Sequence, residues 1–427
     1  MTVKATPPAV AGGAAAEQGA AARGRRDRYA LWFPLAVYAL TRAVDALFLV
    51  VLSHRQVAMT GLDPNIRLAY PSPADPGYGV VATNWDGQWY RLIAEQGYPL
   101  DLPVDVHNHV VMNGWAFFPL FPLTAGLLSR LTGLGFTTVA PLLNVTLGAL
   151  AVVVMYRLLA GRLSRFAASA TVVATCVFMS APTMQLSYTE GLALLLVCLT
   201  LLLLRDRRYA WFAVAALALS LTRPIAMVLV PVVAAHWWAR HRDPDDTAFA
   251  AQRKRIALLV PWCVAVTGLW PLIAGITTGD LFAYPKTMAA WKVYSSNIPI
   301  GSWFGREIRD RGLVLGLLLC LAVPVLLFYV VRRPAARNWG PEVRTWAWAY
   351  PAYLFAVTAP GPSIVRYLLL AFPLMWPVPD RVSPAGVARV QRLVVLVTMV
   401  GVGLLLQWYW ISEYLVIHNQ PHRGPFP

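Results

Sequence analysis

The sequence predicts an all-α protein, a polytopic bundle of transmembrane helices, from three observations. Of its 427 residues, 58% are hydrophobic and only 13% are charged, and the mean hydropathy is +0.55. Apolar runs recur at close to the length of about 20 residues that an α-helix needs to cross a bilayer. Basic residues cluster at the ends of these runs, as they do in loops that face the cytoplasm. From this pattern we expect about eleven crossings.

The formal net charge of +16 fits a membrane protein better than a nucleic-acid-binding protein. The basic clusters would meet anionic lipids, and no groove of alternating basic and aromatic residues is visible. All cysteines lie within apolar runs, so neither a disulfide framework nor a CxxC metal site is expected. The preference for arginine over lysine suggests a GC-rich bacterial genome, so the expected location is a bacterial plasma membrane. The basic clusters are Arg23, Arg25, Arg26 and Arg28; Arg205, Arg207 and Arg208; Arg253, Lys254 and Arg255; and Arg332 and Arg333.

The first 28 residues are rich in Ala and Gly and end in arginines, which predicts a disordered basic cytoplasmic tail at residues 1–28. Residues 29–410 then form the transmembrane domain. Residues 31–52 cross outward and stay as a signal anchor, because no small-residue cleavage site follows them. They deliver residues 53–114 to the outer side as the first extracytoplasmic loop.

Within this loop, residues 84–98 have a helical pattern. If the helix begins at Trp85, then Trp85, Trp89, Leu92 and Gln96 share one face and Ile93 lies beside them. This spacing predicts an amphipathic helix that lies in the membrane surface, with Asp86 at its start beside the lipid headgroups.

The next two apolar runs pose a problem of parity. Residues 115–131 are interrupted by Pro119 and Pro122, and residues 138–160 lead into Arg162 and Arg165. If both runs crossed fully, these arginines would lie outside, against the positive-inside tendency. We therefore expect residues 115–131 to be re-entrant or partly inserted, which prolines permit where protein covers the backbone.

The rest of the chain is expected to alternate between the two sides. Residues 211–238 have inner flanks at both ends but carry Arg223-Pro224 at their centre, so we expect two short helices that meet at an outer break. The other expected elements are crossings at 166–181, 190–204, 256–276, 312–331 and 343–357, a second extracytoplasmic loop at 277–311, an outer turn at 361–367, two final crossings that end at Trp410, and an outer C-terminal tail at 411–427.

This topology gathers Asp86, Glu190, Arg223, Asp280 and Arg366 at the outer side. A charge within the membrane costs roughly 2.5 to 3.5 kcal/mol, so Arg223 within an apolar run suggests a function. Two arginines could clamp a phosphate, and Asp86 could act as a general base. The alternatives are that each arginine snorkels or pairs with an acid, that Asp86 is an N-cap, and that Glu190 is a simple interfacial residue.

Two further clusters resemble metal sites only weakly. Asp243-Pro244-Asp245 has an Asp-x-Asp spacing, but it lies in a short inner loop without the surrounding strands of soluble nucleotide-sugar transferases. His107 and His109 lie near acidic residues in the first outer loop, where a hydrated loop is the simpler interpretation. The sequence therefore indicates no divalent metal and no other cofactor.

Five short motifs, in order across roughly residues 80–295, give the chain a family resemblance. It resembles the mannosyltransferases related to the enzyme that adds the second mannose of glycosylphosphatidylinositol anchors, which are polytopic glycosyltransferases of the GT-C superfamily. The motifs are Trp85-Asp86-Gly87 with Trp89-Tyr90, Ile93-Ala94 and Gly97-Tyr98; Phe117-Phe118-Pro119-Leu120-Phe121-Pro122; Ser187-Tyr188-Thr189-Glu190; Thr222-Arg223-Pro224; and Gly279-Asp280-Leu281-Phe282-Ala283 with Trp291 downstream.

The resemblance implies a polyprenyl-phosphate sugar donor, an extracytoplasmic lipid or glycan acceptor, and transfer with inversion. Asp86 would be the catalytic base, and Arg223 or Arg366 would neutralise the leaving phosphate. Further substrate contacts are expected from Trp85, Trp89, Tyr90, Glu190 and Asp280. The alternative is a transporter or flippase of a lipid-linked saccharide, which should show inverted internal repeats, and none is evident. An arginine-rich tail departs from the eukaryotic members, and the acceptor does not carry over to a bacterium.

Overall fold

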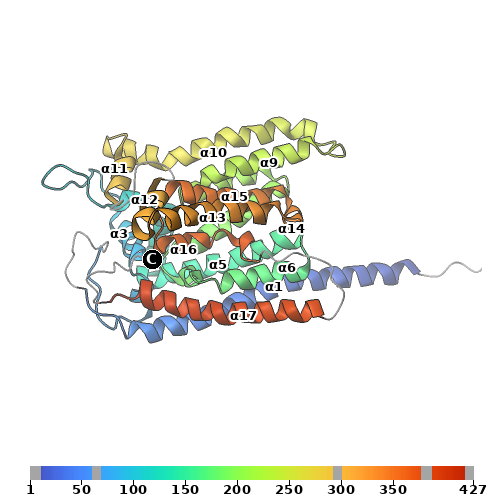
Figure 1. Cartoon of the computed structure of the whole chain (residues 1–427), viewed down its shortest axis with the longest axis horizontal. Coiled ribbons are helices and arrows are strands. Elements are labelled where there is room, and N and C mark those ends of the chain that lie inside the picture. Colours follow the sequence, from blue (N-terminus) through green and yellow to red (C-terminus); the bar gives the residue numbers. More distant parts are fainter. Residues whose placement is uncertain (1–10, 60–68, 292–300, 377–386, 419–427) are drawn as a thin grey trace, which may run out of the picture.

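The computed structural model describes residues 11–59, 69–291, 301–376 and 387–418, and within these ranges it is helical, with isolated bridges in place of strands (Figure 1). This confirms the predicted all-α class. In the described part, five helices are long and apolar enough to cross a membrane: Arg28–Ser53, Phe136–Ala160, Phe249–Thr278, Leu313–Arg332 and Val390–Leu415. The number of about eleven crossings stays a prediction.

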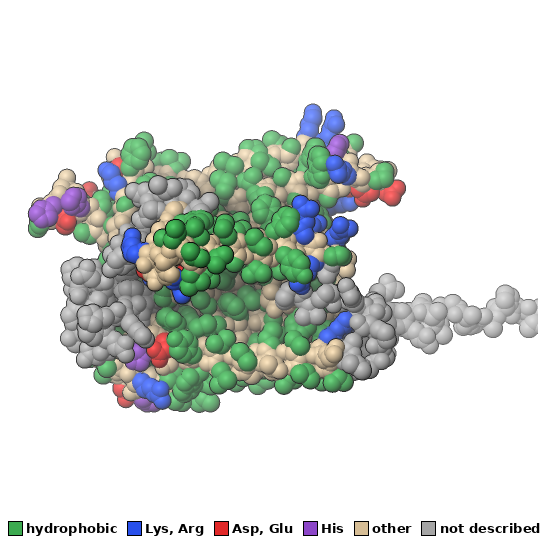
Figure 2. Space-filling view, viewed as in Figure 1, with side chains coloured by type: hydrophobic (Ala, Val, Ile, Leu, Met, Phe, Trp, Pro, Cys, Tyr) green, Lys and Arg blue, Asp and Glu red, His purple; other side chains and the backbone are tan. Residues whose placement is uncertain are grey.

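The long helices run side by side, and the bundle has two chemically different ends. At one end, which we name the arginine end, residues 157–165, 205–208 and 240–246 meet. Arg205 donates to Leu158 O there (2.7 Å), and Arg207 pairs with Asp246 (3.0 Å). At the opposite end, which we name the loop end, lie residues 53–114. In Figure 2 basic side chains gather at the right-hand, arginine end of the bundle.

Helix α1 (Ala11–Ser53) is 43 residues long, or about 65 Å, which is roughly twice the thickness of the hydrocarbon core. Its N-terminal part projects beyond the bundle at the arginine end (Figure 1). The expected disordered tail covers residues 1–28, whereas the structure has helix from Ala11, where an alanine-rich stretch continues α1. Residues 1–10 lie outside the described part.

The first long loop contains α2 (Tyr78–Val81), α3 (Asp86–Gln96) and the 3₁₀ turn η1 (Gly114–Ala116); its residues 60–68 are not described. The prediction that lipid covers the aromatic face of α3 is wrong, because protein covers it. Trp85 and Trp89 are buried, and the Trp89 ring packs on Phe117 (5.9 Å) and on Trp291 (5.1 Å). An apolar helix face has the same spacing whether lipid or protein covers it.

Helix α4 (Leu120–Thr132) has 13 residues, or about 20 Å, which is too short to cross a core of about 30 Å. Its start bonds to the bend after α8 through Leu120 N and Leu221 O (2.9 Å). Near its end, Arg130 donates to Ala94 O in α3 (3.3 Å). Helix α5 (Phe136–Ala160) then runs from α3 to the arginine end. Helix α4 is thus too short for a full crossing, and its partial insertion in the membrane stays a prediction.

The chain breaks between α6 (Arg165–Cys176), the 3₁₀ turn η2 (Ala181–Gln185) and α7 (Glu190–Arg205). Side chains from distant helices satisfy the carbonyl groups that this break frees. Arg42 of α1, which pairs with Asp45 (2.8 Å), donates to Cys176 O (2.9 Å) and to Ala181 O. Gln407 donates to Cys176 O (3.0 Å). No sequence pattern identified these contacts.

The next hairpin consists of α8 (Tyr209–Ser220), the 3₁₀ turn η3 (Ala226–Val228) and α9 (Leu229–His241). It is the pair of short helices expected on either side of Arg223-Pro224. The ion pair between Arg207 and Asp246 (3.0 Å) joins the two flanks at the arginine end, so Arg223 at the break lies toward the loop end.

The C-terminal half differs from expectation in its short elements. The expected loop at 277–311 contains two helices, and residues 292–300 within it are not described. The described residues directly after α16, up to Trp376, form turns and not a long helix: Trp346 donates to Leu370 O (2.9 Å) and Trp376 packs on Phe166 (6.0 Å). Two final crossings were expected after residue 367, and the described residues there contain one long helix, α17. The elements are α10 (Phe249–Thr278), α11 (Ala283–Trp291), α12 (Gly301–Arg311), α13 (Leu313–Arg332), α14 (Pro334–Arg337), α15 (Gly340–Val357), α16 (Pro362–Leu368), η4 (Phe372–Leu374), α17 (Val387–Trp410) and the π-turn η5 (Ile411–Leu415).

The described residues of the expected outer C-terminal tail, 411–418, pack against the protein, and their place outside the membrane stays a prediction. Ile411, Leu415 and Ile417 are fully buried in a small core that includes Leu52 and Trp85. Val57 N donates to Ile417 O (3.1 Å), so this segment packs against the loop that follows α1. Its apolar residues are too few to span a membrane but enough to form a core contact.

Candidate active site

Four charged side chains from distant parts of the sequence meet at the loop end, and we name them the charged cluster: Asp86, Glu190, Arg223 and Arg366. Arg366 Nη2 lies 2.6 Å from Asp86 Oδ2, and Arg366 Nε lies 3.1 Å from Glu190 Oε1. The same Glu190 oxygen lies 2.5 Å from Arg223 Nη2. The predicted gathering of these residues therefore occurs, as one alternating chain of acids and bases.

Asp86 is the first residue of α3, and an unusual backbone places it there. Trp85 before it has φ 57° and ψ −117°, a conformation that costs a bulky residue about 1–3 kcal/mol. The Trp85 indole donates to Leu415 O (2.8 Å) and Tyr188 donates to Asn84 O (3.0 Å), so contacts from both sides hold the turn. The N-cap position belongs to Trp85 and not to Asp86, and the Asp86 carboxylate bonds to Arg366 instead.

Glu190 is the first residue of α7, which packs very closely on α5. Gly191 N donates to Asn144 Oδ1 (2.9 Å), and a Cβ at Gly191 would lie 2.3 Å from that oxygen. Only glycine permits this approach. As a result, the Glu190 side chain is 0% exposed, which excludes the simple interfacial role considered from the sequence.

The two arginines share aromatic and hydroxyl partners. Arg223 lies in the bend between α8 and η3, and its Nε donates to Thr189 Oγ1 (2.9 Å). The guanidinium groups of Arg223 and Arg366 lie 5.5 and 5.3 Å from the ring centre of Tyr367, and Arg366 also lies 5.0 Å from that of Tyr188. Aromatic faces stabilise such buried cations.

Exposure separates the members of the cluster. The side chain of Asp86 is 26% exposed and that of Arg366 is 5% exposed. Arg366 Nη1 is buried and has no hydrogen-bond partner among the described residues. The cluster therefore presents one accessible carboxylate, suited to accept a proton, beside one guanidinium with unused donors, suited to bind an anion.

The aromatic residues predicted to contact substrate lie on α3 next to Asp86. Tyr90 donates to Thr189 Oγ1 (3.5 Å) and packs on Phe117 (5.1 Å). Trp89 and Trp85 are buried as described above. Their roles in binding stay predictions.

Asp280 lies apart from the charged cluster, at the start of α11. Its carboxylate pairs with Lys286 (2.6 Å) and accepts Phe282 N (2.9 Å). The hydrogen bond from Lys286 and the backbone bond from Phe282 lower the pKa of Asp280. These contacts are those of a structured turn, and a role in substrate binding stays a prediction.

Neither weak metal candidate has the geometry of a metal site in the described residues, where no group of three or more His, Cys, Asp and Glu side chains could hold an ion. Asp246 pairs with Arg240 (2.6 Å) and Arg207 (3.0 Å), and the bonds from Arg240 lower its pKa to about 2. Asp105 accepts the backbone N–H groups of His107 and His109 (2.9 and 2.8 Å), and the bond from His109 lowers its pKa.

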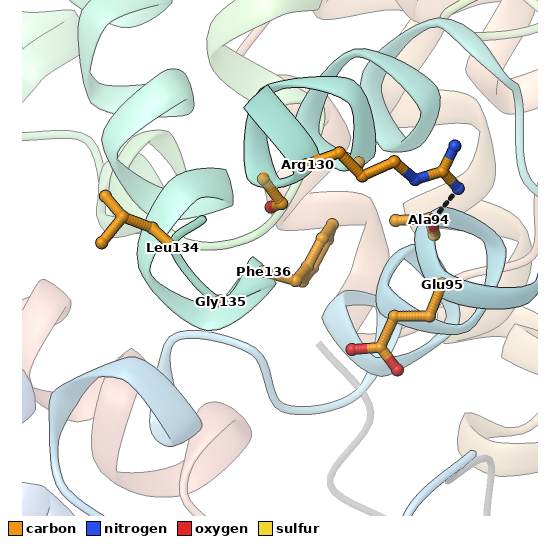
Figure 3. Close-up of a pocket in the computed structure, with 8 residues that line it drawn as sticks. Ala94, Glu95, Arg130, Leu134, Gly135 and Phe136 are labelled. Carbon is orange, nitrogen blue, oxygen red and sulfur yellow. Dashed lines mark hydrogen bonds between the residues drawn. The ribbon is translucent and has the colours of Figure 1, made fainter. Parts of the chain in front are cut away.

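A pocket of about 260 Å³ lies at the far end of α3, between α3, α4 and the start of α5 (Figure 3). Figure 3 shows Arg130 reaching to Ala94, with Glu95 next to Ala94 on the same helix. No member of the charged cluster lines it, so it is separate from the candidate active site.

Tyr367 and Tyr188 were not singled out from the sequence as site residues. Tyr188 lies in the motif that carries Glu190, and Tyr367 follows Arg366 directly. Their adjacency to charged residues is the available signal, but aromatic residues are too frequent at helix ends near a membrane for that signal to decide.

No family model matches the chain, and no curated protein matches it. Solved structures do. The archaeal oligosaccharyltransferase AglB from Archaeoglobus fulgidus, in complex with an inhibitory peptide and a dolichol-phosphate, aligns with 92% of this chain at 12% identity and TM-score 0.49; the chain spans 57% of its length. ArnT from Cupriavidus metallidurans, bound to undecaprenyl phosphate, aligns with 88% of this chain at 16% identity and TM-score 0.50, over 68% of its own length. At this identity the likeness to the ArnT structure shows the fold alone.

Proposed function

We propose that this multi-pass membrane protein, whose fold is of the GT-C type, is a glycosyltransferase that uses a polyprenyl-phosphate sugar as donor. The acceptor is a lipid or glycan at the extracytoplasmic surface, and the sugar is a hexose, with mannose suggested by the family resemblance. Asp86 is the general base, and Arg366 and Arg223 bind the donor phosphate. The undecaprenyl phosphate in the ArnT structure is consistent with such a donor.

One observation carries the proposal: an accessible carboxylate lies 2.6 Å from a buried guanidinium that has unused donors. Displacement at an anomeric carbon needs a base for the acceptor hydroxyl and a cation for the departing phosphate, close together. Asp86 and Arg366 supply this pair at the loop end.

The reaction is a single displacement. The acceptor oxygen bonds to the anomeric carbon while its proton passes to Asp86. The bond from that carbon to the phosphate oxygen breaks, and its electron pair stays on the phosphate, where Arg366 and Arg223 offset the added charge. Because phosphate is already a stable leaving group, no general acid is required, and attack from the opposite face inverts the sugar carbon.

The first prediction tests Asp86. The purified protein in lipid nanodiscs, given a polyprenyl-phosphate hexose and membrane acceptors, should transfer the sugar, and Asp86→Asn should reduce kcat by about 10²- to 10⁴-fold, the usual contribution of a general base. Asp105→Asn is the control: it removes an exposed acid of the same loop and should leave kcat unchanged. Full activity in a folded Asp86→Asn variant would exclude Asp86 as the base.

The donor sugar and acceptor are best identified by lipid and cell-wall glycan analysis of a deletion strain, because a missing sugar names both at once. If the wild-type protein instead moves a lipid-linked saccharide across a vesicle membrane without transferring its sugar, the flippase alternative replaces the proposal.

A further inference from the structure

The two carboxylates of the charged cluster differ in access. The side chain of Glu190 is 0% exposed, whereas that of Asp86 is 26% exposed. An incoming ligand can therefore replace Asp86 as a partner of the arginines, but it cannot reach Glu190. Asp86 is therefore an exchangeable partner of the arginines, and Glu190 is a fixed one.

Arg366 lies between the two acids and divides its nitrogens among them. Nη2 bonds to Asp86 Oδ2 at 2.6 Å. Nε is 3.1 Å from Glu190 Oε1, which is an ion-pair distance at an angle outside the range of a hydrogen bond. Nη1 is buried without a hydrogen-bond partner in the described residues. The guanidinium therefore has donors left for a third anion.

We infer that Arg366 exchanges its hydrogen bond with Asp86 for hydrogen bonds with the donor phosphate. Glu190 remains paired with both arginines as a positioning residue. The inference rests on the proposed function, because the phosphate is that of the polyprenyl-phosphate donor. It changes the role expected for Glu190 from a substrate contact to a support for Arg366 and Arg223.

Charge balance supports the exchange. The cluster holds two acids and two arginines, so it is neutral before the donor binds. A phosphate that displaces Asp86 from Nη2 gains Nη1 as a second donor, and guanidinium groups bind phosphate most strongly through two parallel hydrogen bonds. Glu190 Oε1 lies within ion-pair distance of both Arg223 (2.5 Å) and Arg366 (3.1 Å), so it offsets the repulsion between two cations that share the Tyr367 ring.

The exchange would make the base available only when the donor is present. While Asp86 Oδ2 accepts the hydrogen bond from Arg366 Nη2 (2.6 Å), that oxygen is not free to receive the proton of the acceptor hydroxyl. Once the phosphate takes over Nη2, Asp86 can accept the acceptor proton. The electron pair of the broken C–O bond then remains on the phosphate that Arg366 already binds, so proton and charge are both accounted for.

The second prediction measures binding and needs no catalysis. Undecaprenyl phosphate is titrated into the full-length protein in nanodiscs, as wild type, Asp86→Asn and Asp105→Asn. Removing the competing carboxylate should tighten binding about tenfold in Asp86→Asn, and Asp105→Asn should bind as the wild type does. Equal or weaker binding by Asp86→Asn would overturn the exchange.

The third prediction concerns Glu190. Glu190→Gln should lower kcat by up to about 100-fold, the cost of a misplaced catalytic group, while the donor KM changes by less than about threefold. Glu190→Asp, which keeps the charge, should recover part of kcat. A large rise in the donor KM with kcat retained would instead show that Glu190 contacts the donor.

A matched control is available at the opposite end of the bundle. Glu342 is also buried and pairs with His236 (2.5 Å). Glu342→Gln therefore removes a buried acid outside the charged cluster, and it should change neither kcat nor the donor KM by more than about twofold. If it impairs kcat as much as Glu190→Gln does, the effect is structural. If Glu190→Gln does not fold, the kcat and donor KM of Glu190→Asp test the role of Glu190, and the titration with undecaprenyl phosphate tests the exchange.

Different results would refute the proposed function and the exchange of Arg366. If the wild-type protein transfers no sugar but Asp86→Asn binds undecaprenyl phosphate more tightly, the proposed function is wrong and the exchange stands. If transfer occurs but both proteins bind the lipid equally, the function stands and the exchange is wrong.

Discussion

Tyr367 shows how much a single residue of this site depends on its neighbours. Its ring lies 5.5 and 5.3 Å from the guanidinium groups of Arg223 and Arg366, which carry like charges. The shared ring, together with Glu190, lets both cations lie close to each other. The ring, more than the hydroxyl group, should therefore matter for donor binding.

The fourth prediction separates the ring from the hydroxyl. Tyr367→Phe should keep the donor KM within about twofold, whereas Tyr367→Leu should raise it about tenfold, because cation–π contacts of desolvated groups are each worth about 1–2 kcal/mol. Steady-state kinetics at saturating acceptor measure both. Equal losses in the two variants would assign the effect to the hydroxyl group.

Short and broken helices build the site, and polar side chains of long helices support the breaks. The chain unwinds between α6 and α7, so Tyr188 and Thr189 lie outside a regular helix directly before Glu190, the first residue of α7. Arg42 satisfies two of the freed carbonyl groups and is itself paired with Asp45. The position of Glu190 thus depends on an ion pair inside α1.

The fifth prediction tests this support. Arg42→Met should destabilise the protein by about 3–5 kcal/mol, because it leaves Asp45 as an uncompensated buried charge. The double variant Arg42→Met/Asp45→Leu should recover a large part of that loss, measured as thermal unfolding in detergent. A double variant no more stable than Arg42→Met would show that the carbonyl bonds, not the ion pair, carry the stability.

For the whole molecule, the two ends of the bundle define a polarity across the membrane. Basic flanks gather at the arginine end, and the positive-inside tendency assigns that end to the cytoplasm. The charged cluster would then face outward. Labelling of single cysteines in intact cells with a membrane-impermeant maleimide checks this: Val106→Cys at the loop end should react and Asp245→Cys should not. The native cysteines are all buried, so the background is low, and the reverse pattern would invert the proposed topology.

Much of this arrangement could be predicted from local features of the sequence. The lengths of apolar runs identified α1, α5, α10 and α13, and Arg223-Pro224 marked the break between α8 and α9. The gathering of Asp86, Glu190, Arg223 and Arg366 at one end of the bundle followed from the alternation of crossings. These features depend only on residues near one another in the chain.

The pairing within the site could not be predicted in the same way. Asp86 and Arg366 are 280 positions apart, and no local pattern tells which acid meets which arginine. The apolar face of α3 was assigned to lipid because its spacing does not distinguish lipid from protein. The buried segment 411–418 was taken for a tail because its apolar run is short.

The contacts of Leu415 with Asn84 and Trp85 also bear on how the protein is made. Leu415 O accepts hydrogen bonds from the Trp85 indole (2.8 Å) and the Asn84 side chain (3.2 Å). Both donors belong to the strained turn that leads into Asp86. Ribosomes add residues 84–85 more than 300 positions before Leu415. During synthesis the turn therefore lacks its hydrogen bonds to Leu415 O until nearly all of the described chain has emerged. A nascent protein would carry all of its charged cluster before it acquires the contact that fixes the base.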